Sequence, residues 1–133
     1  MATTRLRVTI DFSLTPPALD VDQKGDVNHI PRSHDLQDIV WQLVGNAATG
    51  SFHPIEGTQP GFAWVGDGPP KDVFGKPELK SNGNQVGLTD LNDGPDSAGT
   101  FVYQLYATVD GKCYSTRADL RIEAANNPAI INR

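Results

Sequence analysis

The chain has little sulfur and no long apolar run: its 133 residues include one cysteine and one methionine. A single cysteine excludes an internal disulfide, and no Asn-x-Ser/Thr glycosylation acceptor is present. No apolar stretch reaches the length of a membrane span, and the N-terminal residues show no apolar core of signal-peptide length. We therefore expect a cytoplasmic protein that has no membrane partner.

Positive charge is also scarce. The chain has 11 Lys and Arg residues against 16 Asp and Glu residues, which gives a formal net charge of -5. A net negative field repels phosphate backbones, so the composition argues against a nucleic-acid partner.

Turn-forming residues are abundant, with 13 glycines and 10 prolines. Frequent turns separate short segments, and this pattern favours strands over long helices. The length suits one domain, residues 1–133. The segments expected to form strands are 4–12, 18–21, 38–44, 51–55, 61–65, 84–90 and 101–109. Residues 36–43 also carry apolar side chains at helical spacing behind a candidate N-cap, Ser33, but their β-branched and aromatic content favours a strand.

Residues 99–116, GTFVYQLYATVDGKCYST, contain the strongest turn signal in the chain. Asp110-Gly111 fits a two-residue type I′ loop, which predicts that residues 112–116 fold back onto residues 106–109. Cys113 then lies in the return strand, where we expect a small buried or half-buried residue. A blue-copper site there would need two imidazoles and usually a thioether, and no histidine follows His53.

Motifs for catalysis are absent from the sequence. Ser33, His34 and Asp35 are contiguous, and adjacent side chains cannot converge as a nucleophile, base and orienting acid. The segment 68–77, GPPKDVFGKP, has six residues between its glycines where a P-loop has four, and a proline replaces the required Ser or Thr. We therefore expect a non-enzymatic protein.

One loop has the oxygen-rich composition that calcium prefers. Asp90, Asn92, Asp93 and Asp96 lie within residues 89–99, although their spacing does not match an EF-hand. The loop is either a solvated turn cluster or a calcium site, and calcium is the only candidate cofactor.

Three further elements resemble those of small bacterial β-sandwich proteins of the AidA/PixA inclusion-body type and of the related DP-EP proteins. The elements are Ile39-x-Trp41-x-Leu43, Gly99-x-Phe101-x-Tyr103, and Asn127-Pro128-Ala129-Ile130, where those families have Asp in place of Asn127. The resemblance implies a cytoplasmic, non-enzymatic sandwich that self-associates.

Together these observations predict an antiparallel β-sandwich, immunoglobulin-like or similar, of about seven to nine strands. The main functional hypothesis is a non-catalytic binding or self-assembly protein. The alternative is a lectin-like carbohydrate-binding module in which loop aromatics, Trp64 and Phe74, hold a glycan, with calcium as a possible aid.

The C-terminal segment 127–133 is a candidate interface for a homo-oligomer. Pro128 belongs at the start of a strand or on an edge, and Ile130 and Ile131 point to opposite faces of the strand that follows. Either a partner chain covers the second isoleucine, or the domain itself does.

Overall fold

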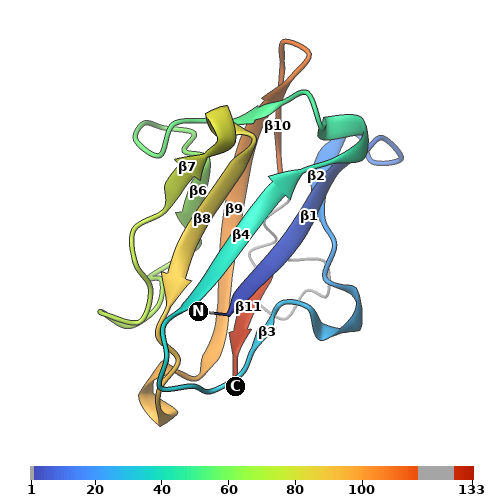
Figure 1. Ribbon diagram of the computed structural model, residues 1–133. Helices are drawn as coiled ribbons and strands as arrows, with labels where there is room; N and C mark the ends of the chain where they lie inside the picture. Colours follow the sequence, from blue (N-terminus) through green and yellow to red (C-terminus); the bar gives the residue numbers. More distant parts are fainter. Residues whose placement is uncertain (1, 117–127) are drawn as a thin grey trace.

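The computed structural model describes residues 2–116 and 128–133, which form a sandwich of two mixed β-sheets (Figure 1). The first sheet has the strand order β2-β1-β4-β8-β7. Its strands are β1 (Thr3–Asp11), β2 (Ala18–Val21), β4 (Gln37–Leu43), β7 (Glu78–Lys80) and β8 (Gln85–Asp90). The second sheet contains β3 (His29–Ile30), β5 (Ser51–Phe52), β6 (Phe62–Trp64), β9 (Gly99–Val109), β10 (Lys112–Ser115) and β11 (Ala129–Asn132).

No α-helix occurs in residues 2–116 and 128–133, and no helix there could cross a membrane. Four 3₁₀ turns lie in the connections: η1 (Lys24–Asp26), η2 (Gly45–Ala47), η3 (Ser81–Gly83) and η4 (Pro95–Ser97).

Strand β9 is the centre of the second sheet and is paired along both sides. One side pairs with β5 and then β6, and the other pairs with β10 and then β11. Its side chains alternate as the sequence predicts, with Tyr103, Leu105, Ala107 and Val109 buried and Phe101 half-buried on one face.

The core lies between the two sheets and contains one aromatic group. Trp41 of β4 and Tyr103 of β9 are both fully buried, and the Trp41 Nε1–H donates a hydrogen bond to the Tyr103 hydroxyl at 2.8 Å. Phe62 packs against both rings, with centroids 5.0 Å from Trp41 and 5.2 Å from Tyr103. This hydrogen bond satisfies the indole donor inside an otherwise apolar core.

Two features of the predicted sandwich are corrected. The sheets are mixed, because β1 pairs with β4 in parallel and β11 pairs with β3 in parallel. The parallel pair arises because the chain crosses from β2 to β3 in the other sheet before it returns as β4. The described residues form eleven strands, and two of them, the two-residue β3 and the three-residue β7, lie outside every segment that the sequence predicted.

The ambiguous segment is a strand, β4, and the predicted β9–β10 hairpin is confirmed. Asp110 and Gly111 have φ of 51° and 79°, and Cys113 pairs with Thr108. The expectation that Cys113 is buried is wrong: the thiol side chain is exposed, because Cys113 shares the solvent face of the sheet with Thr108.

The C-terminal strand is not an edge strand, and Pro128 stands directly before it, which is the other position expected for this proline. β11 lies between β9 and β3. Ile130 faces the core with no exposed surface, while Ile131 is half-buried opposite Thr100 and His29. The domain itself therefore covers Ile130 and part of Ile131, and an oligomer interface at residues 127–133 stays a prediction.

Candidate functional site

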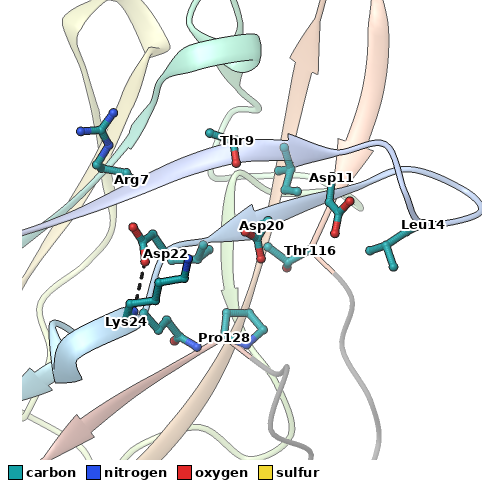
Figure 2. Close-up of a pocket in the computed structure, with 12 residues that line it drawn as sticks. Arg7, Thr9, Asp11, Leu14, Asp20, Asp22, Lys24, Thr116 and Pro128 are labelled. Carbon is teal, nitrogen blue, oxygen red and sulfur yellow. Dashed lines mark hydrogen bonds between the residues drawn. The ribbon is translucent and has the colours of Figure 1, made fainter.

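A groove of about 750 Å³ lies beside β2 in the described part of the structure (Figure 2). Strand β1 places Leu6, Val8 and Ile10 in the core, so the alternate residues of β1 face outward and line the groove. The lining consists of Arg7, Thr9, Asp11, Leu14, Leu19, Asp20, Val21, Asp22, Gln23, Lys24, Thr116 and Pro128. These residues come from both sheets.

Hydrogen bonds hold the two walls of the groove together. The Gln23 side-chain oxygen accepts from the Ala129 backbone N–H at 2.9 Å, which joins the end of β2 to the start of β11. On the other wall, the Thr116 hydroxyl oxygen accepts from the Leu105 backbone N–H at 3.0 Å. An isolated parallel bridge also links Leu19 to Thr116. The shape of the groove is therefore built into the backbone frame.

Three carboxylates and two cations give the groove a mixed polar surface. Asp11 accepts from the backbone N–H and hydroxyl of Ser13, and Asp22 accepts from the Lys24 backbone N–H. No side-chain hydrogen bond to Asp20 is seen within residues 2–116 and 128–133. Partial burial raises the pKa of Asp20, as do the neighbouring Asp11 and Asp22 carboxylates, while Lys24 opposes the shift.

Asp20 is thus a carboxylate that accepts no side-chain hydrogen bond from the described residues. It lies opposite Thr9 in the β1–β2 pair and lines the groove together with Thr116 (Figure 2). A ligand that donates hydrogen bonds would satisfy this carboxylate and relieve the repulsion from Asp11 and Asp22.

An exposed aromatic side chain follows the groove residue Asp11. Phe12 is 60% exposed, the largest exposed fraction among the large apolar residues of the described chain, and it packs edge-to-face against Tyr114 with centroids 6.3 Å apart. Tyr114 lies two residues before the groove residue Thr116. Aromatic side chains beside acceptors and donors form a surface suited to flat or polyhydroxylated ligands.

The predicted aromatic residues, Trp64 and Phe74, do lie together, with ring centroids 4.7 Å apart. Both are half-buried and pack against the core, and Trp64 also meets Phe62 edge-to-face at 4.9 Å. A Cβ atom at position 68 would lie 3.4 Å from the Trp64 Cβ, so Gly68 packs closely beside Trp64. Neither aromatic residue lines the groove.

The four residues predicted to bind calcium occupy two different environments. Asp90 and Asn92 have no exposed surface, whereas Asp93 and Asp96 are exposed. The Asn92 amide donates to the Ile30 and Arg133 carbonyls, and its oxygen accepts from Ser97. Within the described ranges, no group of three or more His, Cys, Asp or Glu side chains is placed to hold a metal ion. The Asp90 side chain contacts Asn132 and the Asn92 side chain contacts Ser97, so the four residues do not converge on one cation position, and the calcium site stays a prediction.

Sequence reasoning missed the groove and its carboxylates. The signal in the sequence was the spacing of three aspartates: Asp20 and Asp22 alternate along and just after β2, and Asp11 ends the neighbouring strand β1. Their convergence depends on the β1–β2 pairing.

No protein-family model matches the chain, and no curated protein matches it significantly.

Proposed function

We propose that this chain is a non-catalytic binding protein and that the groove beside β2 is its ligand site. The observation that carries the proposal is the Asp20 carboxylate, which stands in a groove of about 750 Å³ without a side-chain hydrogen bond from the described residues. Thr9 supplies a hydroxyl, and Arg7 and Lys24 supply donors along the same surface. Small-molecule sites commonly combine a concave apolar floor with a few such polar groups.

A glycan is the ligand class that fits this surface best. Sugar hydroxyls both donate and accept, so they match a groove that alternates carboxylates with cationic donors. Phe12 adds an exposed ring next to Asp11, which can stack on the apolar face of a sugar. Phe12 replaces Trp64 and Phe74 in this role, because those two rings pack against the core.

The experiment compares glycan-array binding by the unmodified protein and by Asp20→Ala, Phe12→Ala and Asp67→Ala. Asp67 is an exposed carboxylate in another loop and serves as the matched control. We expect Asp20→Ala and Phe12→Ala to weaken binding at least about tenfold, as loss of one good polar or stacking contact should. Absence of glycan binding by the unmodified protein, or equal binding by Asp20→Ala, would overturn the proposal.

Self-assembly is the second candidate function, and the free edge of β7 favours it. β7 pairs only with β8 among the described strands, and Leu79 is 37% exposed. If two copies paired antiparallel about Leu79, Glu78 of each chain would lie opposite Lys80 of the other. Opposite charges in such cross-strand pairs are stabilising, and an edge that is complementary to itself suits a two-fold dimer.

Light scattering on three variants tests the β7 edge. Glu78→Lys should abolish the dimer by placing like charges opposite each other, and Lys80→Glu should do the same. The double variant Glu78→Lys, Lys80→Glu restores complementarity and should restore the dimer. A monomer in the unmodified protein, or a dimer that Glu78→Lys leaves unchanged, excludes this edge.

The resemblance to inclusion-body-type proteins and the immunoglobulin-like classification both stay predictions. Ile39, Trp41, Leu43 and Tyr103, which carry much of the resemblance, are buried core residues. Packing residues support a shared architecture but say little about a shared ligand. The cytoplasmic location likewise stays a prediction.

A further inference from the structure

Two buried oxygen atoms have no hydrogen-bond partner among the described residues: Asp90 Oδ2 and Asn132 Oδ1. Their residues already contact each other, because the Asn132 Nδ2–H donates to Asp90 Oδ1 at 3.0 Å. Asp90 has no exposed surface and Asn132 is 3% exposed. A buried polar atom without a partner is costly, so two of them on one bonded pair require an explanation.

The pair lies at one end of the core, where the two sheets face each other. On β8, Val86 and Leu88 point inward, and the alternation brings Asp90 to the same face. On β11, Ile130 points inward and Asn132 follows on that face, opposite Gly99 of β9. Asp90 and Asn132 therefore occupy inward-facing positions at which the alternation of the two strands predicts apolar side chains.

The orientation of the Asn132 amide is fixed by its other contact. Nδ2 also donates to the Ser97 carbonyl at 2.9 Å, so both amide hydrogens have acceptors. Turning the amide over would bring its oxygen toward the Ser97 carbonyl and Asp90 Oδ1, which are both acceptors. The unpartnered Asn132 oxygen is thus a real acceptor that needs a donor.

We propose that Asp90 carries a proton in the folded protein and donates it from Oδ2 to Asn132 Oδ1, forming a pH-sensitive latch between the two sheets. One proton then satisfies both unpartnered oxygens, and the acid and the amide exchange two hydrogen bonds. When the proton leaves, the buried carboxylate keeps one donor from Asn132 and loses the other bond.

The charge environment supports a neutral acid. Burial raises the pKa of Asp90 to about 6, and the hydrogen bond from Asn132 opposes the shift. The groups that face Asp90 from the other elements are Gln37, its partner on β4, and Phe74, its bridge partner, and neither is charged.

Charged residues on those elements have other surroundings. In the 91–98 loop, Asp93 and Asp96 are exposed. On β4, Asp38 is half-buried and adjoins Gln37, so it points to the opposite face of the strand. Arg133, beyond β11, contacts His29 through its guanidinium and lies 3.8 Å from Asp26. No cation among these neighbours neutralises an ionised Asp90.

The latch connects to the C-terminal strand through a chain of hydrogen bonds. Ser97, whose carbonyl accepts from Asn132, donates its hydroxyl to Asn92 Oδ1 at 2.7 Å. Asn92 in turn donates to the Ile30 and Arg133 carbonyls, both at 3.0 Å. Ionisation of Asp90 should therefore loosen the attachment of β11 to β3 and to the loop before β9.

The sign of the effect follows from the raised pKa. The folded state holds the Asp90 proton to a higher pH than the unfolded state, in which the pKa is near 3.8. The stabilisation is complete below pH about 4 and is lost as the pH rises through about 6. Well above pH 6 the free energy of unfolding no longer changes with pH through this group.

The test compares urea unfolding of the unmodified protein, Asp90→Asn and Asp93→Asn from pH 4 to pH 8. Asn at position 90 supplies a permanent N–H donor to Asn132 Oδ1, so it mimics the protonated acid. The ratio of the folding equilibrium constant of Asp90→Asn to that of the unmodified protein should rise about a hundredfold from pH 4 to pH 8. Asp93→Asn, the same charge change at an exposed position in the adjoining loop, should show no such rise.

Two further measurements complete the test. The ¹³C carboxyl shift of Asp90 in the unmodified protein should titrate near pH 6. Hydrogen exchange of the Arg133 amide, which donates to the Ile30 carbonyl, should be faster in the unmodified protein than in Asp90→Asn at pH 7.5 and equal at pH 5. An Asp90 midpoint near 4 with a flat stability difference would overturn the proposal and assign a bridging water to the two oxygens. Unequal Arg133 exchange at pH 5 would overturn the connection to β11.

Discussion

Two polar contacts cross the core between the sheets, and they differ in how completely they are satisfied. In the Trp41–Tyr103 contact, the indole donor and the phenol oxygen meet at 2.8 Å among aromatic rings. In the Asp90–Asn132 contact, one hydrogen bond forms and two oxygens remain without partners among the described residues. The first contact needs nothing from solvent, whereas the second is complete only when it holds a proton.

The difference shows that a polar contact between the sheets can either hold its protons at all relevant pH values or change its protonation with pH. Burial raises the pKa of the Tyr103 hydroxyl above its ordinary value near 10.0, so this group keeps its proton at any physiological pH. Burial raises the pKa of Asp90 only to about 6, which lies within the range that cells and compartments reach. The acid–amide pair therefore senses pH, and the indole–phenol pair does not.

Of the three variants considered, Trp41→Ala should lower the free energy of unfolding the most. The variant removes the largest fully buried side chain and leaves a cavity beside Phe62 and Tyr103. We expect a loss of about 3–5 kcal/mol in the free energy of unfolding. Urea unfolding at pH 5 and at pH 7.5 should give the same loss, because Trp41 does not titrate. A loss below about 1 kcal/mol would contradict the central place of this ring in the core.

Asn132→Ala should have the next largest effect. It deprives Asp90 Oδ1 and the Ser97 carbonyl of their shared donor, and a buried group without a partner costs about 1–3 kcal/mol. We expect a loss of about 2–4 kcal/mol at pH 7.5 from these two groups together. The loss should be larger at pH 5, where the variant also removes Asn132 Oδ1, the acceptor of the Asp90 proton. A loss that shrinks as the pH falls would contradict the latch.

Tyr103→Phe should have the smallest effect of the three. The variant keeps the ring packing against Phe62 and removes the acceptor of the Trp41 Nε1–H. One neutral donor left without a partner costs about 1–3 kcal/mol. Thermal unfolding should show this loss unchanged between pH 5 and pH 7.5, in contrast to Asn132→Ala. A pH-dependent loss would mean that the two contacts are coupled.

Much of the sandwich is predictable from local pattern. The alternation in residues 101–109 and the Asp110-Gly111 pair place the β9–β10 hairpin correctly, because both signals depend on neighbours in sequence. The parallel pairing of β1 with β4 has no local signal, since it depends on where the chain crosses between sheets. β3 and β7 are too short to show a period of two, although the equally short β5 and β6 fall within predicted segments.

The functional features divide in the same way. The inward position of Asp90 follows from the spacing of Val86 and Leu88, but its contact with Asn132 joins two sheets and cannot be obtained from either strand alone. The groove has the same origin, because Asp20 meets its neighbours through the β1–β2 pairing and the second sheet. The sequence predicts Trp64 and Phe74 to be exposed loop aromatics, because their neighbours in sequence are turn residues and their contacts with the core come from distant segments.

The pairing of β3 with β11 has a consequence for the order of folding. Ile131 lies opposite His29, so this pair joins residues about 100 positions apart in the chain. Contacts between such distant residues are slow to form, because the intervening chain must first give up its freedom. During synthesis, β3 therefore cannot pair with β11 until β11 has left the ribosome, and its edge stays unpaired until then. A strand of only two residues keeps this unpaired edge short, which limits wrong pairing with other chains.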